Sequence, residues 1–281
     1  MITVLGASGF IGSNIVTKLM RDGKDVYAPK RDEYFADRDL GHIIYCIGMT
    51  ADFRTKPFET VDAHVCLLKY ILETCVFESL TYLSSTRIYI KSKTKKKYLT
   101  EEDDIVVNSR DAFDLFTASK ITGELLALNS GRENIKIVRL SNVFGADLHS
   151  QNFITTIVRD ALTNKKVELF TTPDSSKDYI SVDDVSGALI KLAYLTKTGI
   201  YNLASGKNTS NKDILNELEK LTGAQTSYSP ESQKIIFHEI SNSKIVKEIK
   251  FKPTKSIINS LPEILLAIQN SNHNTNDNLP R

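Results

Sequence analysis

The sequence has few cysteines and no pattern that would use them for a metal or a disulfide. Its three cysteines, Cys46, Cys66 and Cys75, have neither metal-binding nor C-x-x-C spacing. All of them lie in apolar segments, where buried free thiols are common. We therefore expect a protein of a reducing, cytoplasmic compartment.

Strong net charge and long apolar runs are also absent. The net charge is +2 with 25% charged residues, which gives no reason to expect nucleic acid or a membrane surface as a partner. No segment reaches the roughly 18 apolar residues of a membrane span. Met1 leads directly into an apolar strand pattern, without a charged leader or a signal core. We also find no metal-ligand spacing and no His near a Ser or Cys that would indicate a hydrolase triad.

What the sequence does contain is a glycine-rich turn at its start. A short apolar strand at residues 2–5 runs into G-A-S-G-F-I-G and then into a helical pattern that ends near residue 22. Gly6 allows a tight turn, Gly9 allows the backbone to approach a diphosphate, and Gly12 allows the helix to pack on the sheet. An ordinary strand-to-helix turn is the alternative. The turn predicts a dinucleotide site formed by Gly6, Ser8, Gly9, Phe10, Ile11 and Gly12.

The residues after the second strand bear on the choice of dinucleotide. A strand at 25–28 is followed by Lys30 and Arg31. An acidic residue at this place usually binds the ribose hydroxyls of NAD, whereas basic residues accommodate the 2′-phosphate of NADP. These residues favour NADP over NAD, with two solvated loop charges as the alternative.

Strand and helix patterns alternate along most of the chain. Further strands are predicted at 42–48, 80–83 and 135–140, with helices near 61–76 and 114–128 between them. This alternation predicts an α/β fold, a doubly wound parallel sheet (Rossmann-like) with a small C-terminal substrate lobe. The polar segment at 32–41 is too short for the strand and helix of a full unit, so the fold looks abridged there.

We expect residues 1–165 to form mainly the dinucleotide-binding domain. Residues 166–269 would form mainly a smaller, discontinuous lobe, some of whose strands and helices return to the sheet. The asparagine-rich residues 270–281 are predicted to be a disordered tail.

Polar groups follow several of the predicted strands at the edge where ligands bind in doubly wound folds. The strand at 42–48 carries Cys46 and Gly48, which we expect beside the cofactor, and Thr50 and Arg54 follow as candidates for contact with substrate. His64, among apolar helix residues, is interpreted as a core or interface histidine. The remaining motifs are S-S-T-R-I-Y at 84–89, F-T-A-S-K at 116–120, R-L-S-N at 139–142 and K-D-Y-I-S-V-D-D-V at 177–185.

This set of motifs resembles the extended short-chain dehydrogenase/reductases, in particular the NAD(P)-dependent nucleotide-sugar epimerase/dehydratase family. The resemblance covers about residues 1–205. It implies that Ser85 binds the reacting sugar oxygen, with Thr86 beside it, and that Asn142 and Lys177 contact the nucleotide-sugar substrate. The family's Tyr-x-x-x-Lys pair falls on Phe116 and Lys120.

The family's chemistry explains why these residue types occur together. Removal of a hydride from a sugar carbon requires removal of the hydroxyl proton, and a phenol with a pKa lowered by a nearby ammonium can accept it. Lys120 would also bind the nicotinamide ribose, while Ser85 would stabilise the oxygen on which charge develops.

Phe116 breaks this unit because phenylalanine has no proton to exchange. Three explanations remain open. The first is that Phe116 is an engineered replacement that stalls turnover. The second is that it is a natural variant in which another acid/base, such as Tyr89 or a carboxylate, transfers the proton. The third is that the protein binds a nucleotide without catalysis.

The resemblance implies oxidation or reduction at a sugar carbon of a nucleotide sugar, by an epimerase, dehydratase or dehydrogenase. The alternatives are an inactive dinucleotide-binding regulatory or scaffold protein and an NADPH-dependent 4-keto-sugar nucleotide reductase. Two long helices, near 61–76 and 114–128, often pack into a homodimer in this family, and we expect the same arrangement here.

Overall fold

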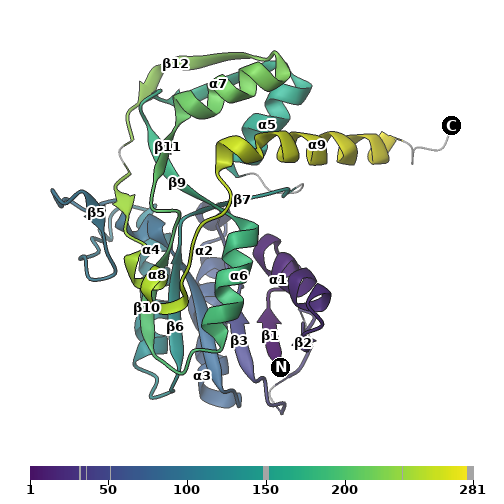
Figure 1. Cartoon of the computed structure of the whole chain (residues 1–281). Coiled ribbons are helices and arrows are strands. Elements are labelled where there is room, and N and C mark those ends of the chain that lie inside the picture. The colour runs from purple at the N-terminus through teal and green to yellow at the C-terminus, as the bar shows by residue number, and fades with distance from the viewer. Residues whose placement is uncertain (32, 36, 51, 148–151, 236, 277–281) are drawn as a thin grey trace.

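The protein consists of a larger lobe built on a parallel sheet and a smaller lobe beyond one end of that sheet (Figure 1). The structure is a computed structural model. It describes residues 1–31, 33–35, 37–50, 52–147, 152–235 and 237–276. Among these residues, no helix is both long and apolar enough to cross a membrane.

The central sheet of the larger lobe has six strands, and every neighbouring pair is parallel. Their order is β10 (Gly199–Leu203), β6 (Ile135–Leu140), β4 (Ser79–Ser85), β3 (His42–Tyr45), β1 (Ile2–Leu5) and β2 (Val26–Tyr27). The predicted doubly wound α/β fold is confirmed.

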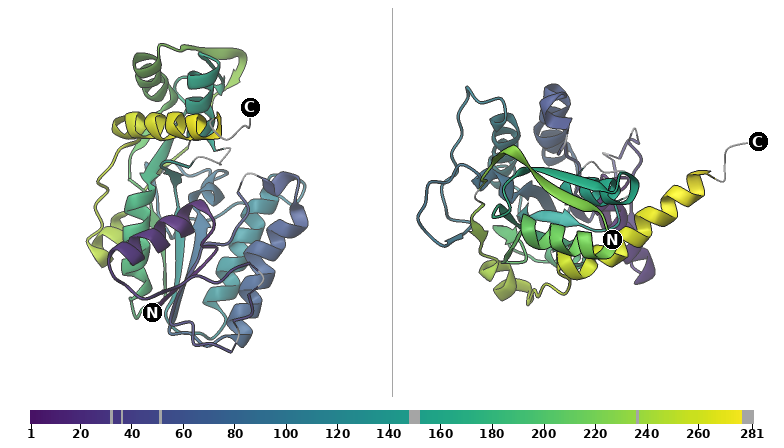
Figure 2. Two further views of the ribbon diagram at one scale, coloured as in Figure 1. Left: turned by 90° about the vertical axis from the view of Figure 1, so that its right-hand side faces the viewer. Right: turned by 90° about the horizontal axis from the view of Figure 1, so that it is seen from above.

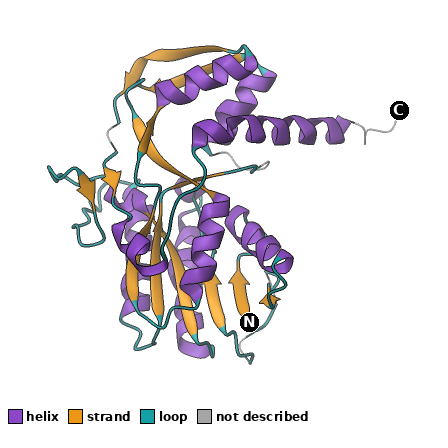
Figure 3. Ribbon diagram, in the orientation of Figure 1, coloured by secondary structure: helices purple, strands orange, loops and turns teal. Residues whose placement is uncertain are grey.

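Helices cover both faces of this sheet (Figures 2 and 3). One face packs against α1 (Phe10–Arg21), α6 (Val182–Ala193) and α8 (Ser243–Ile249), and the other against α3 (Leu67–Thr74) and α4 (Asp114–Leu128). Successive strand residues serve opposite faces: Val4 belongs to the first core and Leu5 to the second. Burial on both sides explains why these strands read as continuous apolar runs.

The sheet ends at β2, which is only two residues long. Between β2 and β3, the described residues form no helix and only one isolated bridge, from Asp39 to Val76. The unit predicted to be abridged at 32–41 is therefore short of one strand and one helix, and the prediction is confirmed.

The helix predicted near 61–76 begins earlier and has a wide turn inside it. It consists of α2 (Pro57–Val61), a π-helical segment η2 (Asp62–Cys66) and α3, which ends at Thr74. The extra residue of a π turn changes which side chains face the neighbouring helix. Here the π segment contains His64, which is fully buried against α4. The interpretation of His64 as a core or interface histidine is confirmed.

The smaller lobe has its own apolar core. Its elements are β7 (Asn142–Phe144), α5 (Phe153–Thr163), β8 (Lys166–Thr171), β9 (Ser176–Ser181), β11 (Asn208–Ser210), α7 (Asn211–Thr222), β12 (Gln225–Gln233) and α9 (Ile257–Asn276). Strand β9 pairs with β7 and β11, and β8 pairs with β12. Helix α5 belongs to this core although it precedes the predicted boundary at residue 165.

The end of the chain and the junction between the lobes complete the fold. Helix α9 continues to Asn276 and so covers the first residues of the predicted tail, while 277–281 lie outside the described residues. Strand β9 leads into α6 without a loop, because Ser181 ends the strand and also caps the helix, its Oγ accepting from the Asp184 N–H at 3.1 Å.

Candidate functional site

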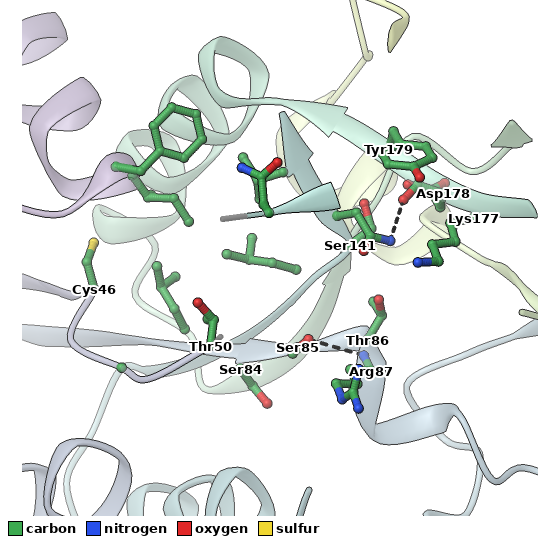
Figure 4. Close-up of a pocket in the computed structure, with 18 of the residues that line it drawn as sticks. Cys46, Thr50, Ser84, Ser85, Thr86, Arg87, Ser141, Lys177, Asp178 and Tyr179 are labelled. Atoms are coloured by element: carbon green, nitrogen blue, oxygen red, sulfur yellow. Dashed lines mark hydrogen bonds between the residues drawn. The ribbon is translucent and has the colours of Figure 1, made fainter. Parts of the chain in front are cut away.

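A cavity of about 850 Å³ lies at the carboxyl ends of the central strands, below the smaller lobe (Figure 4). Its walls come from the glycine turn before α1, from the residues after β3, β4 and β6, and from β9. This is the edge at which doubly wound sheets bind ligands. The volume is in the range of small-molecule sites.

The glycine turn is shaped by two different constraints. Gly6 has a φ of +85°, which side-chain-bearing residues rarely adopt. A Cβ on Gly12 would lie 2.2 Å from the Gly6 carbonyl oxygen, so only glycine fits there. A Cβ on Gly9 would be 3.4 Å from the same oxygen, an ordinary contact, so the protein itself does not require glycine at this position.

The turn also leaves the start of α1 open towards the cavity. Gly9 is the N-cap residue and no side chain caps the helix. The first N–H groups and the positive end of the helix dipole therefore remain available to an anion. A glycine without a steric reason at the N-terminus of an uncapped helix fits the diphosphate of a dinucleotide.

Most of the predicted site residues line this single cavity. They are Ser8, Gly9, Phe10, Ile11, Gly12, Cys46, Gly48, Thr50, Ser85, Thr86, Phe116, Lys120, Asn142 and Lys177. Gly6 forms the turn behind it. Lys30, Arg31 and Arg54 do not line the cavity, and all three side chains are exposed.

Lys120 is buried at the inner end of the cavity. Its Nζ donates a hydrogen bond to the carbonyl oxygen of Leu83 (2.8 Å) and lies 5.0 Å from the centroid of the Tyr82 ring. Burial lowers the pKa of Lys120 to about 7, although the carboxylate of Glu124 acts in the opposite direction. A cation with this pKa would respond strongly to any anion or dipole that binds beside it.

Phe116 is one helical turn before Lys120 and is also buried. Its ring centroid lies 5.4 Å from that of Phe53 and 5.6 Å from that of His64. The position is thus held by ring packing, and the residue offers no proton to the cavity.

His64 cannot replace the missing phenol. Its Nε2 accepts a hydrogen bond from the Met49 N–H (3.1 Å), and its Nδ1 lies 2.8 Å from Ser119 Oγ. Since Nε2 is an acceptor, the neutral ring carries its proton on Nδ1 and donates to Ser119. Burial and the nearby Lys120 lower the pKa of His64 to about 3, so the ring stays neutral. His64 therefore attaches η2 to α4 and does not titrate near neutral pH.

Tyr89, the phenol considered as a substitute, is already engaged. Its hydroxyl accepts from Arg139 Nη1 (2.6 Å) and lies 3.0 Å from both the Thr100 carbonyl oxygen and Asn202 Oδ1. Burial raises the pKa of Tyr89 to about 12. These contacts argue against Tyr89 as the acid/base.

Below the cavity lies a buried polar network that sequence reasoning missed. Glu124 binds Arg139 through both carboxylate oxygens, with contacts from 2.6 to 3.2 Å, and Ser84 donates to Glu124 at 2.5 Å. Arg139 also donates to Tyr89. Glu124 is four residues after Lys120 on α4, which is the spacing that could have indicated a shared face.

Several hydroxyl groups at the cavity make one hydrogen bond or none within the part of the chain that the structure describes. Ser85 Oγ accepts only from the Arg87 N–H, at 3.1 Å (Figure 4). The buried hydroxyls of Ser141 and Tyr179, which also line the cavity, have no hydrogen-bond partner among the described residues. Buried hydroxyls normally find partners, so these two are suited to a polar ligand. Sequence reasoning did not single out either one, although Ser141 directly follows the end of β6.

Asn142 and Asp178 are joined beside these groups, within the small sheet that contains β7 and β9. Asn142 Nδ2 donates to the Asp178 carbonyl oxygen (2.8 Å). The Asp178 carboxylate accepts from the backbone N–H groups of Ser205 and Gly206, at 2.9 and 2.7 Å. Asp178 is therefore occupied by the chain and fixes the strand that carries Lys177.

Comparisons with known proteins agree with this geometry. The model of the NAD dependent epimerase/dehydratase family matches residues 2–204. The chain is 22% identical to the UDP-glucose 4-epimerase of Mycolicibacterium smegmatis, over 79% of this chain and 82% of that protein. It is 23% identical to the dTDP-glucose 4,6-dehydratase of Streptomyces griseus, over 92% and 91%.

Two solved structures have the same fold. The UDP-glucuronic acid 4-epimerase from Bacillus cereus, in complex with UDP-glucuronic acid and NAD, is 18% identical with a TM-score of 0.78, covering 96% of this chain and 99% of that one. RMD from Pseudomonas aeruginosa, complexed with NADPH, is 19% identical with a TM-score of 0.78, covering 96% and 100%. Since the family model spans most of the chain, the protein belongs to the NAD dependent epimerase/dehydratase family.

Proposed function

We propose that the chain binds a nicotinamide dinucleotide and a nucleotide sugar in this cavity, and that its reaction is oxidation or reduction at a sugar carbon. The observation that supports this most strongly is the convergence of Gly9, Ser85 and Lys120, from three distant segments, on one cavity. The named relatives act on nucleotide sugars.

In this proposal the residues divide along the cavity. The turn from Gly6 to Gly12 holds the diphosphate of the dinucleotide, and Lys120 orients its ribose. Ser85 binds the reacting sugar oxygen, while Asn142 and Lys177 contact the substrate diphosphate. The bound nicotinamide supplies or accepts the hydride. Lys30 and Arg31 would favour NADP from the outer end.

The proton is the step for which the chain lacks an obvious carrier. Phe116 has no exchangeable proton, His64 is held neutral, and the Tyr89 hydroxyl is occupied. We therefore expect binding of both ligands and slow turnover. General acid/base catalysis typically contributes about 10² to 10⁴ in rate.

The test is Phe116→Tyr, assayed with a panel of UDP-, dTDP- and GDP-sugars and both dinucleotides. We expect epimer, dehydrated product or reduced cofactor to form about 100-fold faster or more in the Tyr variant. Phe113→Tyr is the matched control, because Phe113 lies just before α4 and is exposed. Equal rates in Phe116→Tyr and the control would contradict an enzyme disabled at this position.

A second candidate is a regulatory protein that binds a dinucleotide without catalysis, favoured by the packing of Phe116 between aromatic rings. It predicts dinucleotide binding with no product in either variant. The shortened edge of the sheet at β2 agrees with a further alternative, a 4-keto-sugar reductase. Such an enzyme would consume NADPH stoichiometrically instead of recycling it.

We also propose that two copies of the chain form a homodimer through α2, α3 and α4. The exposed apolar side chains Phe58, Tyr70 and Leu125 lie on these helices. Light scattering tests it: a monomeric mass would contradict the dimer.

A further inference from the structure

Arg87 is a cation of the cavity wall that forms no ion pair with the described residues. It follows β4 within the short helix η3 (Thr86–Tyr89) and is partly buried. Its guanidinium carbon lies 5.6 Å from the ring centroid of Phe53 and 5.9 Å from that of Phe116. Among the described residues, no carboxylate forms an ion pair with it.

A second unpaired cation extends into the cavity from the smaller lobe. Lys177 Nζ lies 5.2 Å from the ring centroid of Phe153 and 5.1 Å from that of Phe237, and no acidic residue in the described part of the chain binds it. Figure 4 shows Lys177 on β9 and Arg87 where β4 leads into η3, both at the cavity. Burial lowers the pKa of each group, and the charge of Arg87 lowers that of Lys177 further.

The carboxylates that could neutralise these cations bind other groups. Asp114, which acts on Arg87 electrostatically, accepts from Lys91 Nζ and from the Asn108 N–H, each at 2.6 Å. Asp178 is occupied by Ser205, Gly206 and Lys207. Burial of unpaired cations is unfavourable, so two of them in one cavity indicate a site for anionic groups.

In the proposed function, the two cations lie at different ends of the bound nucleotide sugar. Lys177 lies beside Asn142 and Asp178, where the proposed function puts the diphosphate. Arg87 lies against Phe116 and two residues after Ser85, where the sugar ring would react. An arginine stacked on aromatic rings keeps its edge N–H groups free, and this planar edge matches a carboxylate.

We infer that Arg87 binds a carboxylate carried by the sugar, so that the substrate is a nucleotide-linked uronic acid and not a neutral hexose. This inference rests on the proposed function, because it places the sugar in this cavity. It adds a specificity-determining residue that the sequence motifs did not indicate.

The experiment measures binding by isothermal titration calorimetry in the presence of the dinucleotide, so that turnover is not required. Its probes are two matched pairs, UDP-glucuronic acid with UDP-glucose and GDP-mannuronic acid with GDP-mannose, together with UDP and GDP alone. The variants are Arg87→Gln, Arg87→Lys and, as a control, Arg110→Gln, because Arg110 is exposed in the loop before α4.

We expect the wild-type chain to bind one uronic acid about tenfold or more tightly than its neutral partner, as charged hydrogen bonds allow. Arg87→Gln should bring this ratio close to one and leave the affinity for UDP or GDP unchanged. Arg87→Lys should keep part of the preference, and Arg110→Gln all of it. Thermal melts of each variant check that folding is intact.

Three outcomes would overturn the inference. The wild-type chain binds both members of each pair equally; or the preference survives in Arg87→Gln; or Arg87→Gln weakens UDP and GDP as much as the sugars, which would assign Arg87 to the diphosphate. In all three the proposed function stands. Absence of binding by every nucleotide and nucleotide sugar would overturn the proposed function as well.

Discussion

Two parts of the cavity contain similar residues but differ in how their charges are paired. We call the buried network of Ser84, Glu124 and Arg139 the floor, and the lining residues Ser85, Arg87, Ser141 and Lys177 the wall. In the floor, Ser84 and Arg139 both bind the Glu124 carboxylate, so that the buried cation of Arg139 has an acidic partner. In the wall, Ser85 and Arg87 come from the same segment and face the cavity, and the guanidinium has no acidic partner in the described structure. Successive residues of β4 point to opposite sides, which separates the two serines.

This difference separates residues that stabilise the fold from residues that are available to a ligand. A buried polar group left without a partner costs about 1–3 kcal/mol, more for a charge, unless something binds it. The floor avoids this cost within the chain. Among the described residues, no carboxylate pairs with Arg87 or Lys177 in the wall and the hydroxyl of Ser141 has no hydrogen-bond partner, so these groups are available to a ligand.

The largest expected effect comes from breaking the floor. Glu124→Gln leaves the charge of Arg139 buried and uncompensated, which should lower the free energy of unfolding by about 3 kcal/mol or more. Urea denaturation measures this loss. Arg87→Gln removes a charge that no carboxylate in the described structure neutralises, so it should not lower the free energy of unfolding and should raise it by up to about 1 kcal/mol. Equal losses in the two variants would contradict the distinction between floor and wall.

The glycine turn offers a second contrast of the same kind. Gly12→Ala forces a Cβ against the Gly6 carbonyl and should cost about 1–3 kcal/mol in a urea titration. Gly9→Ala meets no such contact, so the melting temperature should change little, whereas dinucleotide affinity should fall about tenfold or more, measured by calorimetry. If Gly9→Ala binds the dinucleotide normally, Gly9 does not face the diphosphate.

The pH dependence of stability tests what it costs to bury the Lys120 cation at the inner end of the cavity. Its pKa falls from an ordinary value of 10.5 to about 7 on folding, so between these pH values the unfolded chain binds a proton that the folded chain does not. Stability should therefore rise with pH above 7. Below pH 7 both states hold the proton and the burial penalty is present in full.

The measurement compares thermal or urea unfolding of the wild-type chain and Lys120→Met at pH 7 and pH 9. We expect the wild-type chain to gain about 2 kcal/mol relative to the variant over this range. Lys136, whose pKa burial lowers to about 8, is present in both proteins, so its contribution cancels. A difference that does not change with pH would show that Lys120 keeps an ordinary pKa.

The smallest effect is expected outside the cavity, at Lys30 and Arg31. Both are exposed, so a 2′-phosphate would interact with them through solvent-screened charges. Replacing both with Ala should reduce the preference for NADP over NAD about three- to tenfold, with a stronger effect at low salt. If the wild-type chain prefers NAD, the assignment of Lys30 and Arg31 to the 2′-phosphate of NADP is wrong, and no variant is needed to show it.

The parts of the fold that sequence could predict are those encoded locally. The apolar strands and the glycine turn depend on neighbouring residues: β1 and β6 have the predicted bounds, whereas the strands predicted at 25–28 and 42–48 are shorter, at Val26–Tyr27 and His42–Tyr45. Strand β9 was missed because its Ser-Lys-Asp start has no apolar alternation, and its pairing with β7 and β11 is set by distant segments. The wide turn at Asp62–Cys66 likewise has no local signal, since it reflects how His64 packs against α4.

The sequence predicts many of the residues that line the cavity, but not the balance of charge among them. The motifs located Ser85, Phe116 and Lys120, all of which line the cavity. Nothing local distinguishes Arg87 from Lys91, two cations four residues apart. The structure pairs Lys91 with Asp111 and Asp114, and leaves Arg87 without such a partner in the described residues. Which of the two cations has carboxylate partners depends on the path of the loop of about twenty residues that brings Asp111 back to Lys91. Only the tertiary structure reveals this path.

The junction between β9 and α6 also has a consequence for motion. One unbroken segment carries Lys177 into the cavity and then continues, through the cap at Ser181, as a helix packed on the central sheet. Asp184 ties the same junction to Thr254, its Oδ1 accepting from the Thr254 hydroxyl at 2.7 Å. The smaller lobe therefore has no slack hinge at this point, and we expect ligands to enter and leave through small local movements at the cavity mouth.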